Sequence, residues 1–388
     1  MIATRARAGA ATVASIIVLA VNLRSVLASF PPLVEAVRAD LGLSATAAGL
    51  ITTLPVLCMG AFATLAPRLA RRAPIERLLV ALMVGTAVGA ALRGLGTTAA
   101  LAGGTLVAGV CIALAQALLP VLVRTKYPEQ SGALTGTFSM AFTLGATIAA
   151  GSAVPLANAL GGWDASLAAW AVPAVIAAVV WSFAPGRTVI ERSPRAALWR
   201  QPVAWAVALF FGTQSMAFYA TLSWLPSILE DAGRSPEVAG LLLAFSSLVQ
   251  LPAAFLAPTV AARLGHQVLL LTGIVLSAAL GVTGLLVAPG VAPLWIVLIG
   301  IGQGGALGLG MMLPLLRGGD ANTAASLTAM TLTVGYLVAA CGPWVLGAVH
   351  DLAGDWTAPL AVLLGITLLE LVPGIAGARA RTIAKNGA

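Results

Sequence analysis

Residues 10–30 read AATVASIIVLAVNLRSVLASF, an apolar run that a single charge interrupts. About 20 apolar residues cross the roughly 30 Å hydrocarbon layer of a membrane as a helix, so this run is long enough to span it. The one charge, Arg24, lies about two-thirds of the way along the run. Because a charge at the bilayer centre costs about 3 kcal/mol on insertion scales, this arginine must face a partner or a water-filled cavity.

Eleven further apolar segments of similar length follow along the chain. We expect them near residues 46–66, 75–92, 100–123, 133–156, 165–184, 203–228, 237–258, 268–287, 293–315, 324–348 and 357–376. Of the 388 residues, 60% are hydrophobic and 9% are charged, and the mean hydropathy is +1.00, which is far outside the range of soluble domains. The sequence therefore predicts an all-α membrane protein with twelve transmembrane helices.

The basic residues predict the orientation of these helices. If both termini are cytoplasmic, seventeen of the 21 Lys and Arg residues fall on the cytoplasmic side, and only Arg38, Arg93 and Arg234 fall on the outer side. Such an excess is typical of cytoplasmic loops. Since these clusters also account for the net charge of +8, they leave no basic face for nucleic acid. We expect a multi-pass protein of the bacterial-type cytoplasmic (inner) membrane, surrounded by the lipid bilayer.

The longest polar connection divides the chain almost equally. Residues 186–202 are rich in arginine, as expected of a cytoplasmic linker. This linker would join an N-terminal six-helix half, residues 1–185, to a C-terminal six-helix half, residues 203–388. Each half then contains six of the twelve predicted spans.

Matched spacings suggest that the two halves are duplicates. Gly49 precedes Pro67 by 18 residues, and Gly240 precedes Pro258 by 18 residues, each pair at a corresponding place in its half. The alternative is chance, since Ala, Gly, Leu and Pro are abundant in this chain. Pseudo-symmetric halves related by an axis along the membrane normal place a substrate site at the midplane between them.

Polar residues inside the apolar segments mark the candidate substrate site. They fall in the first, fourth, seventh and tenth segments, which are equivalent helices if each half is itself a repeat, together with one tyrosine in the eleventh. These candidates are Arg24, Gln116, Gln214, Ser215, Tyr219, Gln303 and Tyr336. Arg24 offers a fixed charge and a planar fork of donors to a carboxylate or another small anion. The alternative is that Arg24 bonds helix carbonyls and that the glutamines only join helices.

Other chemistry has little support in the sequence. Glu370 is the only acidic residue within an apolar segment, but it lies near the cytoplasmic end and Arg379, so a snorkelling side chain or an interfacial ion pair is favoured over a proton relay. The three cysteines and two histidines are scattered, and no nucleophile and base pair is evident. We expect no enzyme activity, no cofactor, no metal site, and a monomer.

Motifs in four of the segments are typical of one group of transporters. They are Asn22-Leu23-Arg24, Leu50-Ile51-Thr52-Thr53-Leu54-Pro55-Val56, Gln214-Ser215 with Phe218-Tyr219 and Trp224-Leu225-Pro226, and Val334-Gly335-Tyr336 with Gly342-Pro343. These residues resemble the CynX/NimT branch of the major facilitator superfamily, the cyanate permeases and 2-nitroimidazole exporters. The resemblance implies the major facilitator fold and alternating access around a central site, with Arg24 as a substrate ligand.

The chain also departs from that family pattern. Gln116 stands where the family tends to have Asn, and Phe138 stands where it tends to have Tyr. Fewer hydroxyl and amide groups around the pocket indicate a substrate more apolar than cyanate. Two functions therefore stay open: secondary active or facilitated transport of a small organic or inorganic anion, by symport, exchange or uniport, and efflux of hydrophobic or nitroimidazole-like drugs.

Overall fold

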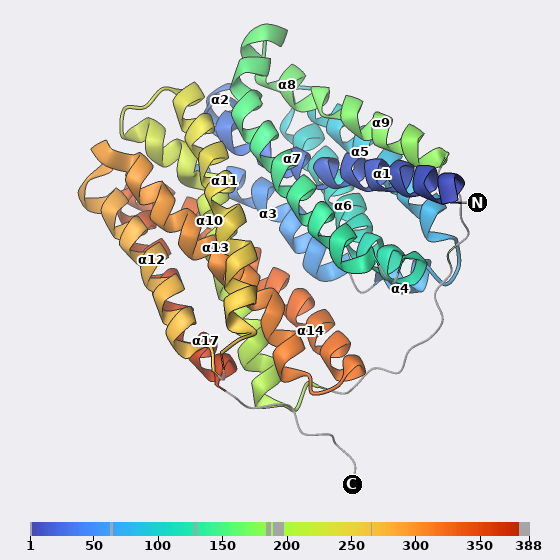
Figure 1. The fold of residues 1–388 in the computed structure, drawn as a ribbon. Helices are drawn as coiled ribbons and strands as arrows, with labels where there is room; N and C mark the ends of the chain where they lie inside the picture. Colours follow the sequence, from blue (N-terminus) through green and yellow to red (C-terminus); the bar gives the residue numbers. More distant parts are fainter. Residues whose placement is uncertain are drawn as a thin grey trace.

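The computed structural model confirms an all-helical chain with membrane-length helices. It describes residues 2–62, 65–127, 130–183, 188, 198–264 and 266–379, so most of the predicted linker 186–202 lies outside the described residues. Within the described part, all regular structure is helical, and 12 segments are long and apolar enough to cross a membrane. Figure 1 shows the helices before residue 184 gathered on one side and those after residue 198 on the other. We call them the first and second helix groups.

The helices match the predicted segments closely. The first helix group contains α1 (Ile2–Ala28), the 3-10 turn η1 (Pro31–Leu33), α2 (Val34–Leu41), α3 (Ala45–Phe62), α4 (Ala66–Leu69), α5 (Ile75–Arg93), α6 (Thr98–Lys126), α7 (Ser131–Leu160), α8 (Trp163–Ala169) and α9 (Ala171–Ser182). The second contains α10 (Pro202–Asp231), α11 (Pro236–Ala261), α12 (Val268–Val287), η4 (Pro289–Val291), α13 (Ala292–Arg317), α14 (Ala321–Ala339), α15 (Cys341–Ala353), α16 (Thr357–Leu369) and α17 (Leu371–Ala378).

Three of the predicted spans are each broken into two helices, and proline accounts for the position of each break. A proline has no N–H, so the carbonyl four residues before it loses its helical hydrogen bond. In each broken span this carbonyl belongs to the last residue of the first of the two helices. The pairs are Ala169 and Pro173, Ala339 and Pro343, and Leu369 and Pro373. Pro55 and Pro226 lie inside unbroken helices, because neighbouring groups can satisfy the freed carbonyls.

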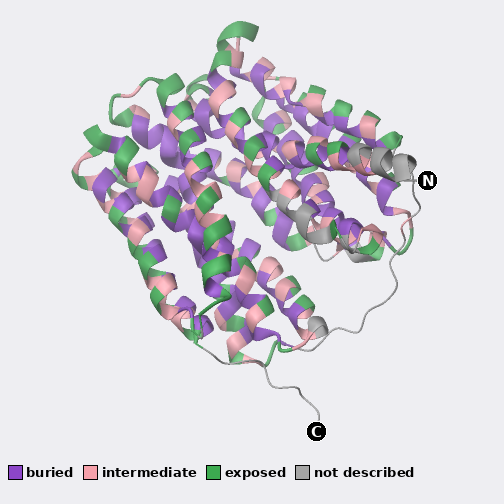
Figure 2. Ribbon diagram, viewed as in Figure 1, coloured by how far each residue is buried: buried purple, intermediate pink, exposed green. Residues whose placement is uncertain are grey.

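Large apolar side chains cover the outside of the bundle. Val84, Val88 and Leu280 are among the exposed ones, on α5 and α12. Figure 2 shows exposed residues along the outer faces of the helices, with buried residues turned toward their neighbours. Soluble proteins rarely expose apolar surface on this scale. In a membrane these faces contact lipid, which agrees with the twelve spans.

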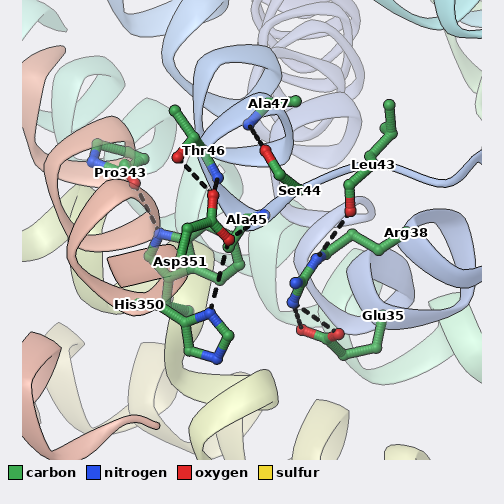
Figure 3. Close-up of polar contacts among 11 residues, drawn as sticks. Glu35, Arg38, Leu43, Ser44, Ala45, Thr46, Ala47, Pro343, His350 and Asp351 are labelled. Atoms are coloured by element: carbon green, nitrogen blue, oxygen red, sulfur yellow. Dashed lines mark hydrogen bonds and ion pairs between the residues drawn. The ribbon is translucent and has the colours of Figure 1, made fainter. Parts of the chain in front are cut away.

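A carboxylate joins the two helix groups at one end of the bundle. We call this end, which carries α2, the α2 end, and the opposite end, where α9 ends and α10 begins, the linker end. Asp351 of α15 accepts hydrogen bonds from the backbone N–H groups of Ala45, at 2.9 Å, and Thr46, at 2.7 Å, and from the Thr46 hydroxyl (Figure 3). The first N–H groups of a helix have no partner within it, and they attract negative charge. Asp351 therefore caps α3 from the other helix group.

Small residues let α3 and α15 pack closely behind this cap. A Cβ added to Gly49 of α3 would lie 2.6 Å from the Pro343 carbonyl oxygen of α15. Trp224 of α10 donates its indole N–H to the same carbonyl, at 2.7 Å, and Thr53 of α3 donates to the Ala340 carbonyl at 2.8 Å. Glycine at such contacts allows the backbones to approach. The α2 end is thus closed by direct contact between the two helix groups.

Candidate substrate site

Arg24 lies in α1 with its guanidinium surrounded by aromatic rings. The side chain is 9% exposed, and its central carbon lies 4.8 Å from the ring centre of Phe142 on α7, 4.7 Å from Phe218 and 5.7 Å from Tyr219 on α10. Among the described residues no acidic side chain forms an ion pair with it, and its Nε has no hydrogen-bond partner. Each ring face attracts the cation by about 0.5–2 kcal/mol. The charge is therefore stabilised without being neutralised.

Arg24 also lines a small enclosed cavity. This cavity has a volume of about 40 Å³, and α1, α7, α10, α11 and α13 contribute to its wall. Its polar lining includes Thr143 of α7 and Ser247 and Gln250 of α11, and Leu222 and Leu307 belong to its apolar lining. A volume of this kind holds only a few water molecules. The cavity therefore accommodates a very small ion as it stands, and a larger ligand needs the helices to separate.

Aromatic and amide groups extend from Arg24 through the second helix group and back to α6 of the first. The Tyr219 ring adjoins Arg24, and its centre is 6.4 Å from that of the Tyr336 ring on α14. The Tyr336 hydroxyl accepts a hydrogen bond at 3.3 Å from the side chain of Gln116 on α6. The Gln116 carbonyl oxygen is buried without a partner. Three of the residues predicted for the site thus adjoin Arg24 in a continuous series.

Gln214 and Ser215 bond to each other one turn along α10. The Gln214 amide donates to the Ser215 hydroxyl at 2.6 Å and to the Phe211 carbonyl at 3.2 Å. The carbonyl oxygen of Gln214 is buried and has no partner. Since Gln214 is four residues before Phe218, the two side chains share a face of the helix. Gln214 therefore presents a free acceptor on the linker side of the ring that covers Arg24.

Gln303 lies apart from this group. Its amide donates to the Thr221 hydroxyl at 2.8 Å and so joins α13 to α10. Both helices belong to the second helix group. This contact matches the helix-joining alternative, and a role in binding substrate stays a prediction.

The sequence argument missed the contributions of α7 and α11. It placed the site on the first, fourth, seventh and tenth spans, whereas Phe142, Thr143, Ser247 and Gln250 belong to the fifth and eighth. A signal was present, because two serines and a glutamine stand within five residues, 246–250, of an otherwise apolar segment. No equivalent signal marks Phe142, which is an ordinary apolar residue until its neighbour is known.

Arg93 is buried inside the helix bundle, a position that the distribution of basic residues did not predict. Its side chain is 1% exposed, and it reaches from the last residue of α5 to donate to the Val26 carbonyl of α1 at 2.8 Å. The last carbonyls of a helix lack partners and favour a positive charge. The end of α1 at Ala28 therefore draws Arg93 inward.

The expected ion pair between Glu370 and Arg379 is also absent from the described residues. Glu370 is 4% exposed and stands at the break between α16 and α17. Arg379 follows the end of α17 with extended backbone. Nine residues separate Glu370 from Arg379, which is about 13 Å along the axis of even a continuous helix, so the two side chains do not meet.

Comparison with known proteins identifies the family. Residues 13–343 match the Major Facilitator Superfamily. The chain is 35% identical to the 2-nitroimidazole transporter of Escherichia coli (strain K12) over 377 residues, which cover 94% of each protein. It is 29% identical to the cyanate transport protein CynX of the same organism over 367 residues, 92% of this chain and 95% of the relative.

A solved structure agrees in fold. The crystal structure of a bacterial homologue of the human lysosomal transporter Spinster, in an inward-facing and occupied conformation, superposes with a TM-score of 0.79 over 95% of both chains, at 15% identity. Together with the twelve spans, these matches confirm the resemblance drawn from the motifs. The chain therefore belongs to the Major Facilitator Superfamily, in the branch of the cyanate and 2-nitroimidazole transporters, and is a multi-pass inner-membrane transporter, not an enzyme.

Proposed function

We propose that this transporter carries a small anion and that Arg24 binds it. The observation that carries the proposal is a buried guanidinium that lines a cavity and has no acidic partner among the described residues. A cation inside a membrane protein normally pairs with an anion or marks a substrate pathway. With the pair missing, the substrate supplies the negative charge, and the free Nε supplies a charge-assisted hydrogen bond.

Alternating access follows if the two helix groups move as rigid halves. We assign residues 1–185 and 203–388 to these halves, with the arginine-rich stretch 186–202 as the linker on the cytoplasmic side. The Asp351 cap and the contact between α3 and α15 then close the outer side. On this assignment the structure is closed to the outside, and release of substrate toward the cytoplasm needs only the linker end to open.

The surroundings of Arg24 indicate a weakly hydrated anion. Phe142, Phe218 and Leu222 supply apolar contact around the guanidinium, and a strongly hydrated ion would lose its water shell there without full compensation. Cyanate, which the relative CynX carries by name, is a small, linear, singly charged ion. It is the first anion to test.

A second candidate is the efflux of planar nitroaromatic drugs. Rings from Phe142, Phe218 and Tyr219 surround the guanidinium, and a flat ligand could stack between such faces. A nitro group would then accept hydrogen bonds from Arg24. This candidate draws on the 35% identity to the 2-nitroimidazole transporter.

Thermal shifts of the purified protein in detergent distinguish these candidates. Wild type, Arg24→Gln and Arg24→Lys are heated with cyanate, benzoate, 2-nitroimidazole or no ligand. A ligand at 100 times its Kd stabilises the folded state by about 2.7 kcal/mol, which raises the melting temperature measurably. Anion transport predicts that cyanate or benzoate stabilises wild type, that Arg24→Gln abolishes the shift, and that Arg24→Lys retains part of it.

The matched control is Arg234→Gln. Arg234 bonds the Gly290 carbonyl at the α2 end, away from the cavity, so this variant keeps every ligand shift. Stabilisation by 2-nitroimidazole alone, unchanged in Arg24→Gln, would support drug efflux without an anion site. Wild type that no anion stabilises would contradict the anion proposal.

A further inference from the structure

A second small cavity lies between Arg24 and the α2 end. Its volume is about 20 Å³, and its polar lining includes Arg93, Thr105 of α6, Thr52 of α3 and Ser223 of α10. Helices of both groups meet here. The cavity is therefore on the interface that has to open if the α2 end becomes accessible.

Two polar groups in this lining are buried without a hydrogen-bond partner. They are the Nε of Arg93 and the hydroxyl of Thr105, on side chains that are 1% and 5% exposed. A buried donor or acceptor that stays unsatisfied costs about 1–3 kcal/mol. The bond from Arg93 to the Val26 carbonyl explains why the arginine reaches α1, but it leaves the Nε and the Thr105 hydroxyl unexplained.

Tyr219 and Leu222 connect this cavity to the site at Arg24. Leu222 lines both cavities. Tyr219 lines the cavity at Arg93, and its ring also lies 5.7 Å from the Arg24 guanidinium. One turn of α10 thus forms the partition between two buried arginines. A ligand that passes this partition leaves one positive charge and meets the other.

We propose that Arg93 and Thr105 form a second anion-binding subsite, which the substrate occupies on its way between the α2 end and Arg24. The Arg93 guanidinium attracts the anion through its charge and its free Nε, and the Thr105 hydroxyl donates to it. The subsite rests on the proposed function, because it takes the same small anion. In the closed structure it has contracted to the size of a water molecule, and it widens when α3 and α15 separate at the α2 end.

Thr105→Val tests the subsite with little risk to folding. The substitution keeps the shape of the side chain and removes a hydroxyl that has no partner, so a purely structural role predicts equal or higher stability and normal transport. The subsite predicts equal or higher stability together with weaker uptake. With radiolabelled cyanate and proteoliposomes, we expect the KM of uptake to rise about three- to tenfold, the effect of one lost hydrogen bond.

Two further variants complete the experiment. Thr86→Val is the matched control, because Thr86 is equally buried on α5 but its hydroxyl bonds the Leu82 carbonyl of its own helix; its KM stays at the wild-type value. Arg93→Lys keeps the positive charge but loses the fork of donors. We expect its KM to rise at least as much as that of Thr105→Val, while the thermal shift with cyanate persists because Arg24 is intact.

The outcomes separate the two proposals. Wild-type KM values in both Thr105→Val and Arg93→Lys would overturn the subsite and leave the site at Arg24 standing. Raised KM values that are matched by Thr86→Val would also overturn it, since the effect would then be a general response of buried threonines. Wild type that neither binds nor transports cyanate would overturn anion transport of this kind and the subsite with it.

Discussion

At the scale of single residues, Arg24 is a buried charge that no acidic side chain of the described residues neutralises. The faces of Phe142 and Phe218 both lie within 5 Å of the Arg24 guanidinium carbon. Aromatic faces stabilise a cation electrostatically without offering it a negative partner. Arg24 therefore keeps its attraction for an anion, which an aspartate or glutamate in the same place would remove.

Replacing one of these rings should weaken both stability and binding. Phe218→Leu keeps an apolar side chain but removes a ring 4.7 Å from Arg24, so we expect the free energy of unfolding to fall by about 1–2 kcal/mol. The melting temperature of the purified protein measures the loss. Phe255→Leu is the control, because Phe255 is 75% exposed on the outer face of α11. Equal melting temperatures for the two variants would contradict a special role for the ring.

At the scale of helices, the closed α2 end depends on one carboxylate and on a few glycines. Asp351 caps α3 across the two helix groups, whereas Asp355 accepts a hydrogen bond at 2.9 Å from the backbone N–H of Thr357, the first residue of the helix that follows it, α16. Both carboxylates accept hydrogen bonds from backbone N–H groups at the start of a helix. Only the first of them connects elements that alternating access must separate.

Asp351→Asn should therefore favour opening at the α2 end. The amide lacks the charge that the N-terminus of α3 attracts, and bonds to a charged group are worth about 1.5–3 kcal/mol. With Cys58, Cys111 and Cys341 replaced and a reporter cysteine at Ile51 in the second cavity, we expect the rate of thiol modification to rise about tenfold. Asp355→Asn should leave this rate unchanged. A rate that is insensitive to Asp351 would show that the cap does not hold this end closed.

Gly49→Ala should disturb the same end by crowding. The added methyl group would lie 2.6 Å from the Pro343 carbonyl oxygen, so the helices must shift, at a cost of about 1–3 kcal/mol. Gly365→Ala on α16 meets nothing within 4 Å and should be neutral or stabilise by up to about 1 kcal/mol through helix propensity. Melting temperatures compare the two. Equal stability in both variants would contradict tight packing between α3 and α15.

At the scale of the whole molecule, the fold was largely readable from the sequence. The predicted segment 268–287 coincides with α12, and the other segments overlap the helices with ends that differ by up to eight residues, because a membrane requires long apolar helices and tolerates little else. The breaks at Ala340 and Glu370 were not predicted, although each can be traced to a proline three residues later. Pro55 lies inside a helix that stays unbroken. Whether a proline breaks its helix therefore depends on neighbouring groups that the sequence alone does not identify.

The candidate site was less readable. The position of Arg24 inside a transmembrane span indicated a functional role, but nothing in the sequence showed that Phe142 and Phe218 would cover its guanidinium. The burial of Arg93 was not predicted, because Arg93 ends its helix, where arginines usually face water, and its contact with the Val26 carbonyl depends on the end of another helix. Contacts between distant segments decide such cases, and periodicity does not report them.

Orientation in the membrane is a prediction for the whole chain. The distribution of basic residues places both termini in the cytoplasm, so green fluorescent protein fused to the C-terminus should fluoresce and alkaline phosphatase at the same position should be inactive. Fusions after Gly233, in the turn between α10 and α11, should give the opposite pattern. The same signal at both positions would contradict the orientation and the span count together.

If the two helix groups alternate as proposed, the capping aspartate also limits how fast the carrier works. Asp351 is exposed to solvent, so water can take over its hydrogen bonds whenever the two helix groups part, and each bond to this charged group nets about 1.5–3 kcal/mol. The three bonds together favour the state in which the α2 end is closed. Each transport cycle then breaks and re-forms the bonds from Asp351 to α3. The three bonds that favour the closed α2 end therefore also contribute to the barrier to opening it.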